Sequence, residues 1–197
     1  YASTSSVYGD QKKFPIKETA NTDSPLSFYA ATKKSNEVMA YSYYNIYGFK
    51  STALRFFTVY GPYGRPDMSL FKFTKAIYEN KKIELYNYGN HIRDFTYISD
   101  VVSAIYKILK QDNTKFEIFN ISSSNPQPLL KFLKIIEKNI GKKAKIKNKV
   151  MQLGDVYKTH GSSRKIKKFT GFVPSITIEK GVSIFIKWYK DYYKINE

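Results

Sequence analysis

A tyrosine and a lysine lie four residues apart in the segment Tyr29-Ala-Ala-Thr-Lys33. The surrounding residues predict a helix over roughly 28–47, with Ser27 at its N-cap and Gly48 at its end. On a helix, side chains at this spacing share one face, and an ammonium near a phenol favours the phenolate. The pair therefore predicts a tyrosine that acts as an acid/base. Because the chain contains 18 tyrosines and many lysines, a chance pair of a packing tyrosine and a solvated lysine is the alternative.

The flanking segments predict the elements that would position this pair. Upstream, four consecutive hydroxyl residues occupy positions 3–6 at the end of a short predicted strand. Downstream, residues 51–57 are apolar enough for a strand inside a parallel sheet, and a Gly/Pro-rich loop follows at 61–67. Further strands are predicted at 83–86, 94–98 and 116–121, and further helices at 68–79, 100–110 with Ser99 as its cap, 128–140, 164–169 and 178–193.

Three longer stretches carry a family resemblance. They are Ala30-Ala-Thr-Lys-Lys-Ser-Asn-Glu37, Gly64-Arg-Pro-Asp-Met-Ser-Leu-Phe-Lys-Phe-Thr74 and Arg93-Asp-Phe-Thr-Tyr-Ile-Ser-Asp100. In this order they make the chain resemble the extended short-chain dehydrogenase/reductase family, the NAD-dependent epimerases and dehydratases of nucleotide sugars. Within that family the chain most resembles UDP-glucuronate 4-epimerases. The resemblance implies an α/β fold: the C-terminal part of a Rossmann-type doubly wound parallel sheet, interleaved with a small α/β substrate-binding lobe.

The same resemblance implies how the chain is divided. Residues 1–60 and 100–121 are expected to form most of the Rossmann part, and residues 61–99 and 122–197 most of the substrate lobe. The family binds its dinucleotide at a Gly-rich turn, and no G-x-x-G-x-x-G or G-x-G-x-x-G occurs in this sequence. We therefore expect the chain to be a fragment that lacks about the first third of a family member. Alone, it is expected neither to hold NAD nor to turn over substrate.

The resemblance also implies residues for catalysis and for binding NAD. It makes Tyr29 the acid/base and Lys33 its electrostatic partner, which also contacts the nicotinamide ribose. Thr4 takes the place of the family's catalytic Ser/Thr, and Ser3 and Phe56 are expected beside the cofactor. In the implied reaction, Tyr29 removes the proton of the sugar 4-OH while C4 gives a hydride to NAD, and the 4-keto sugar turns before the hydride returns to its other face.

The substrate is expected to be a UDP-sugar, and two features favour an acid sugar. Ser5 and Ser6 stand where related dehydratases and decarboxylases have acidic residues, which argues against both of those reactions. Thr58 stands where UDP-glucose 4-epimerases generally have asparagine. A UDP-uronate needs donors for its carboxylate, which these three hydroxyls and Arg65 could supply. UDP-glucuronate to UDP-galacturonate is the predicted conversion, and UDP-glucose or a UDP-N-acetylhexosamine is the alternative.

Three further residues are expected to bind the rest of the nucleotide. Arg93 matches a family arginine that binds the UDP diphosphate, and Gln152 and Asp155 match the late substrate loop. Asp100 is interpreted as a charge at a helix start. His91 and His160 show no partner pattern and are interpreted as loop residues. With no cysteine and no histidine pair at helical spacing, no metal site is expected.

Composition bears on partners and location. The formal net charge is +17, yet the lysines are spread along the chain, so we expect no nucleic-acid binding. No apolar run is long enough to span a membrane, and the absence of cysteine is compatible with a reducing cytoplasm. The family implies a homodimer, and a role in capsule or cell-surface polysaccharide synthesis. The alternative from another class is a truncated remnant that binds or scaffolds without catalysis.

Overall fold

The computed structural model describes residues 1–112 and 115–195. Its central element is a parallel sheet of three strands in the order β1-β2-β7, formed by Ala2–Thr4, Thr52–Phe56 and Glu117–Ile121. The middle strand is buried at Ala53, Leu54 and Arg55. A parallel sheet covered on both faces has such a strand at its centre. The expected strands at 51–57 and 116–121 and the expected α/β fold class are confirmed.

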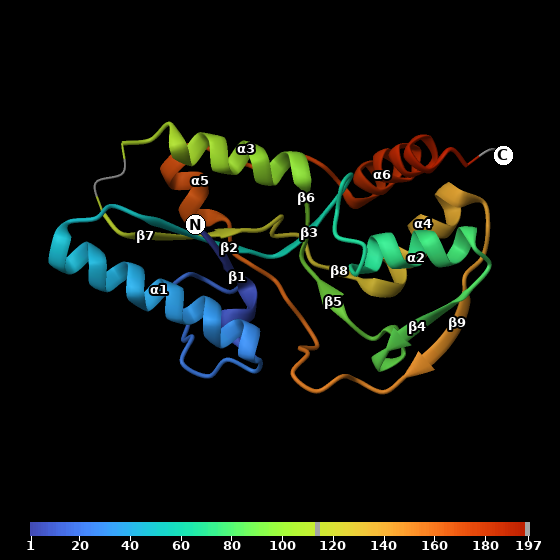
Figure 1. Cartoon of the computed structure of the whole chain (residues 1–197), viewed down its shortest axis with the longest axis horizontal. Coiled ribbons are helices and arrows are strands. Elements are labelled where there is room, and N and C mark those ends of the chain that lie inside the picture. The colour runs from blue at the N-terminus through green and yellow to red at the C-terminus, as the bar shows by residue number, and fades with distance from the viewer. Residues whose placement is uncertain (113–114, 196–197) are drawn as a thin grey trace.

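Helices cover both faces of this sheet (Figure 1). α1, Phe28–Tyr47, lies against β1 and the short 3₁₀ helix η1, Ser5–Tyr8. α3, Ile98–Leu109, and α5, Arg164–Thr170, lie on the other face. Between these two helices and the sheet is an apolar core, whose buried members are Leu54, Val101, Ala104, Ile108, Phe119, Ile121, Ile166 and Phe172.

The second lobe contains α2, α4 and α6 and the strand pair β4–β9. The helices are Ser69–Tyr78, Leu129–Ile140 and Ile178–Tyr193, and the parallel strands are Lys82–Tyr86 and Lys145–Lys149. The core of this lobe is rich in aromatic rings. Phe95 stacks on Phe132 with ring centroids 4.1 Å apart, and Phe185 and Tyr189 of α6 pack on Phe71 of α2.

Short elements join the sheet to this lobe. β3, Thr58–Tyr60, leaves β2 after one residue and pairs in parallel with β6, Phe95–Tyr97. β5, Ile92–Arg93, pairs with β8, Gln127–Pro128, and η2, Asn87–Gly89, connects β4 to β5. No helix in the described ranges combines the length and apolarity needed to span a bilayer.

Local capping explains the ends of α1. Ser27 Oγ accepts a hydrogen bond from the Ala30 amide, and Gly48 ends the helix in the left-handed conformation. Both predicted ends are therefore confirmed. The predicted cap at Ser99 is wrong, because α3 starts at Ile98 after an extended Tyr97 with no side-chain cap. Asp100 lies in the first turn as expected, but its carboxylate accepts hydrogen bonds from the main chain of Ser175 and Ile176.

The outer edge of β7 is covered by side chains from two other segments. Lys165 Nζ donates to the Ile118 carbonyl at 2.8 Å, and the Asn120 amide donates to Glu18 Oε1 at 2.9 Å. Lys165 also pairs with the carboxylate of Glu117 on the same strand. Two outward-facing main-chain groups on this edge, the Ile118 carbonyl and the Asn120 amide, therefore have hydrogen-bond partners without a further strand.

A close contact between α6 and β3 leads to a stability prediction. A Cβ atom at Gly181 would overlap the Tyr60 hydroxyl oxygen and lie 2.8 Å from two ring carbons of this buried side chain. Gly181→Ala should therefore lower the free energy of unfolding by about 1–3 kcal/mol, although alanine favours helices. Urea unfolding of the chain measures it, with the exposed Ser183→Ala on the same helix as control. Equal stability of the two variants would contradict the tight packing.

Candidate active site

Predicted catalytic and cofactor residues meet at the carboxyl ends of the parallel strands. Thr4 and Phe56 are direct neighbours in register as the last residues of β1 and β2. η1 starts at the next residue of the first strand, so Ser5 and Ser6 lie at the same end of the sheet. In open α/β sheets, ligands bind in the crevice outside these strand ends.

Tyr29 and Lys33 lie in the first turns of α1, the helix that contacts β1 and η1. The side chain of Tyr29 is about half exposed at 52%. Lys33 Nζ donates to the main-chain carbonyl of Ala2 at 3.1 Å, which fixes the ammonium over β1. Arg65 lies near enough to interact electrostatically with the Tyr29 phenol. The loop at 61–67 therefore approaches the start of α1.

A buried ion pair holds α1 against the sheet two turns beyond Tyr29. Arg55 of β2 donates from Nε and Nη2 to the two carboxylate oxygens of Glu37, at 2.9 and 2.7 Å. Ser3 Oγ donates to the same carboxylate at 2.5 Å, so the predicted cofactor residue Ser3 has its hydroxyl engaged inside the protein. Burial alone would raise the pKa of Glu37, but the hydrogen bonds from Arg55 and Ser3 outweigh it and lower the pKa.

The hydroxyl run bends sharply because Thr4 caps η1. Thr4 Oγ1 accepts from the Ser6 amide and donates to Ser6 Oγ, both at 3.2 Å. Thr4 is buried, Ser5 is half-buried and Ser6 is exposed. The three hydroxyl groups therefore lie beside the strand ends and differ in their exposure to solvent, which increases from Thr4 to Ser6.

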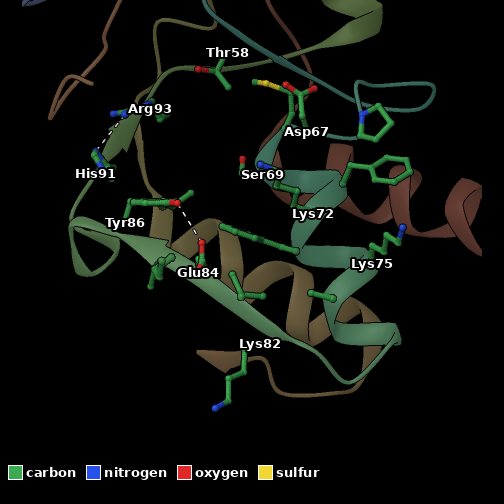
Figure 2. A pocket seen from close by; sticks show the side chains of 18 of the residues that line it. Thr58, Asp67, Ser69, Lys72, Lys75, Lys82, Glu84, Tyr86, His91 and Arg93 are labelled. Atoms are coloured by element: carbon green, nitrogen blue, oxygen red, sulfur yellow. Dashed lines mark hydrogen bonds between the residues drawn. The ribbon is translucent and has the colours of Figure 1, made fainter. Parts of the chain in front are cut away.

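A pocket of about 720 Å³ holds most of the predicted substrate residues. Thr58, Arg93, Gln152 and Asp155 all line it, although they come from three separate segments of the sequence. Figure 2 shows Lys72 and Ser69 of α2 across from Glu84 and Tyr86 of β4, with Arg93 and His91 at one end. Thr58 follows Phe56 by two residues, so this pocket begins next to the strand ends described above.

Arg93 is held at the pocket wall by four hydrogen bonds. Nη2 donates to Asp155 Oδ1 at 2.8 Å and lies 3.2 Å from His91 Nδ1. Nη1 donates to the carbonyls of Tyr157 and Ile92 at 3.0 and 3.2 Å. Burial lowers the pKa of Arg93, and Asp155 opposes this shift. Arginine stays charged in proteins, so the pocket has a fixed cation at this end.

Of the predicted substrate residues Arg65 and Thr58, only Thr58 lies in the pocket wall. Arg65 does not line this pocket; it is exposed and forms a two-point ion pair with Asp67, whose side chain does line the pocket. Thr58 is tied to the segment that carries Arg93, because its amide donates to the Asp94 carbonyl at 3.1 Å. Asp94 is fully buried, and its carboxylate accepts from Ser123 and from the Gly161 amide.

His91 is a pocket residue that the sequence analysis missed. It is only 4% exposed and lines the pocket beside Arg93 and Asp155. The sequence pattern predicts only a loop residue at this position and no binding role. His91 and Arg93 are two residues apart, and in an extended segment this spacing puts both side chains on one side. That signal was available in the sequence. Among the described residues, no group of three or more His, Asp or Glu side chains is arranged for a metal ion.

Comparison with known proteins identifies the family. Residues 1–122 match the sequence pattern of the NAD dependent epimerase/dehydratase family. The chain belongs to this family. Its sequence is 52% identical over 189 residues to an uncharacterized protein of Methanocaldococcus jannaschii. The alignment covers 96% of this chain and 58% of that protein.

Two further relatives of this epimerase/dehydratase chain have named activities. A probable UDP-glucuronate 4-epimerase of Rhizobium meliloti is 41% identical over 211 residues, covering 98% of this chain and 62% of the relative. The crystal structure of UDP-glucuronic acid 4-epimerase from Bacillus cereus, with UDP-glucuronic acid and NAD, superposes with a TM-score of 0.93 at 30% identity, covering 98% of this chain and 61% of that one. The chain thus spans less than two thirds of the length of these relatives.

Proposed function

We propose that the intact protein is an NAD-dependent C4 epimerase of a UDP-sugar and converts UDP-glucuronate to UDP-galacturonate. The observation that carries this proposal is the combination of two sites in one chain. Lys33, which shares the first turns of α1 with Tyr29, bonds to strand β1, this strand ends at Thr4, and the adjacent pocket contains Arg93. The relatives from Rhizobium meliloti and Bacillus cereus, which are named for this reaction, support it.

The proposed chemistry needs a proton acceptor for the sugar 4-OH. The exposed Tyr29 phenol can take that proton, and the ammonium of Lys33 can stabilise the resulting negative charge. Thr4 would hydrogen-bond the same 4-OH and orient it for transfer. The epimer would form when the hydride returns to the opposite face of C4 and Tyr29 gives the proton back to O4. Arg93 with Asp155 and Gln152 would hold the nucleotide in place meanwhile.

The residues at the strand ends suit the nicotinamide half of NAD. The Lys33 ammonium and the partly exposed Tyr29 phenol are donors of the kind that ribose hydroxyls require, and the half-buried Phe56 offers an apolar surface. Since the Ser3 hydroxyl is bonded to Glu37, Ser3 would contribute through its main chain. When bound, NAD would supply the hydride acceptor for C4.

The uronate preference rests on Ser5, Ser6 and Thr58. A carboxylate in a closed site needs several donors, and hydroxyls provide them without the charge repulsion that acidic residues would cause. The exposed Arg65 would add a positive charge if its loop closes over the substrate. We also propose a homodimer, a cytoplasmic location and a role in polysaccharide synthesis.

One experiment separates the candidate substrates. The full-length protein is incubated with UDP-glucuronate and, separately, with UDP-glucose, and the C4 epimers are resolved by chromatography. Conversion of the acid alone is the expected result. Conversion of the neutral sugar would change the proposed substrate to UDP-glucose. Failure to convert either sugar would contradict both substrates and leave the UDP-N-acetylhexosamine as the next one to test.

A further inference from the structure

His91 is a buried titratable side chain that the proposed reaction does not use. Its ring lies between two charged side chains, Arg93 at the end of β5 and Asp155 in the loop between β9 and α5. Its main chain is fixed as well, because its amide donates to Gly89 and its carbonyl accepts from Leu129, at 2.9 and 2.8 Å. The ring therefore has a defined position at the pocket wall, beside the cation (Figure 2).

The contacts of the ring determine which nitrogen carries the proton. Nδ1 lies 3.2 Å from Arg93 Nη2 and 3.3 Å from the Val156 carbonyl. The guanidinium can only donate, and a charged donor forms the stronger hydrogen bond, so Nδ1 accepts from Arg93. The proton then resides on Nε2, which has no hydrogen-bond partner among the described residues and lies 3.7 Å from Asp155 Oδ2.

The charges around the ring keep it neutral. Burial and the positive charge of Arg93 lower the pKa of His91, and the carboxylate of Asp155 only partly opposes them. A neutral ring can accept from Arg93, whereas a protonated ring could not. His91 and Asp155 therefore both accept hydrogen bonds from Arg93 Nη2, His91 as a neutral acceptor and Asp155 as an anion.

We propose that His91 is a positioning residue that orients the Arg93 guanidinium for the diphosphate of the nucleotide sugar. This inference rests on the proposed function. An arginine held only by a carboxylate can follow that carboxylate as its loop moves, and Asp155 belongs to a largely exposed loop. A second acceptor next to β5, whose main chain is hydrogen-bonded to Gly89 and Leu129, keeps the guanidinium at the pocket wall. Because the four Nη hydrogens are engaged, Arg93 would act on the phosphates through its fixed positive charge and through the Nε–H.

A double-mutant cycle tests whether His91 acts through Arg93. Binding of UDP to the full-length protein is measured by titration calorimetry for the wild type, Arg93→Met, His91→Leu and the double variant. Arg93→Met should weaken binding by roughly tenfold to a hundredfold, and His91→Leu by about fivefold. In the Arg93→Met background, His91→Leu should cause no further loss.

A conservative substitution separates the hydrogen bond from packing. Asparagine and leucine have similar shapes, but only asparagine places an acceptor where Nδ1 lies. His91→Asn should therefore bind UDP within about twofold of the wild type, while His91→Leu does not. Thermal unfolding of each variant confirms that the fold is kept, and His160→Leu, outside this pocket, is the control histidine.

The outcomes distinguish this inference from the proposed function. If the wild type does not bind UDP, the substrate site itself is wrong. If the wild type binds UDP and Arg93→Met weakens it, but His91→Leu adds its full loss in the double variant, only the positioning role is overturned. Equal losses for His91→Asn and His91→Leu would likewise overturn it, because packing would then explain the effect.

Discussion

Replacing Tyr29 by phenylalanine is expected to abolish epimerisation by the full-length protein while leaving its fold intact. The change removes only a hydroxyl from a side chain that is half exposed at the start of α1, so little packing is lost. Without the phenol oxygen, the sugar 4-OH would lose the proton acceptor that we propose for it. General acid–base groups contribute about a hundredfold to ten-thousandfold in rate, and a loss in that range is expected.

The assay compares kcat for UDP-glucuronate epimerisation in Tyr29→Phe and in a matched control. Tyr43→Phe makes the same change on the same helix, at a side chain that is 59% exposed and contacts Tyr47. The control should retain full activity. Equal activity of the two variants would remove Tyr29 from the reaction, whereas binding of UDP should be unchanged in both, because the pocket around Arg93 does not include either tyrosine.

The second large effect concerns the stability of the sheet half. Glu37→Gln leaves the Arg55 guanidinium buried, with only 3% of its side chain exposed and without its charged partner. Breaking a buried ion pair from one side typically costs about 3–5 kcal/mol. Urea unfolding should show a loss of this size, and Asp10→Asn, which breaks the exposed pair with Lys12, should change stability by less than about 1 kcal/mol.

The same carboxylate predicts a pH dependence. The folded protein lowers the pKa of Glu37 from its ordinary value of 4.5, so this group stabilises the fold above that value. Its contribution is lost as the pH falls through the lowered pKa and the carboxylate becomes protonated. The free energy of unfolding of the wild type should therefore fall more steeply on acidification than that of Glu37→Gln. Parallel curves would show that the ion pair does not contribute.

The sequence predicted those features whose causes are local. Ser27 and Gly48 end α1 where their own capping chemistry requires, and Gly141 ends α4 in the same left-handed conformation. Strand β2 was predictable because an uninterrupted apolar run suits the middle of a parallel sheet. The family, confirmed by comparison, was visible in motifs such as the one that begins at Arg93.

Features that depend on distant contacts were not predictable in the same way. Asp100 was interpreted as a helix-start charge, yet its partners lie 75 and 76 residues away. The two-residue spacing of His91 and Arg93 is a local signal that both side chains share one side of the segment. The approach of Asp155 and Val156 to this pair, 62 and 65 residues downstream, has no local signal, because the fold alone brings these segments together.

The covered edge of β7 has a consequence for self-association. A strand from another molecule could pair there only by displacing Lys165 from the Ile118 carbonyl and Glu18 from the Asn120 amide. Lysine is a poor neighbour for an incoming strand, since its charge would have to be stripped of water or moved aside. The side chains of Lys165 and Glu18 thus oppose the addition of further strands at this edge of the sheet, and with it aggregation.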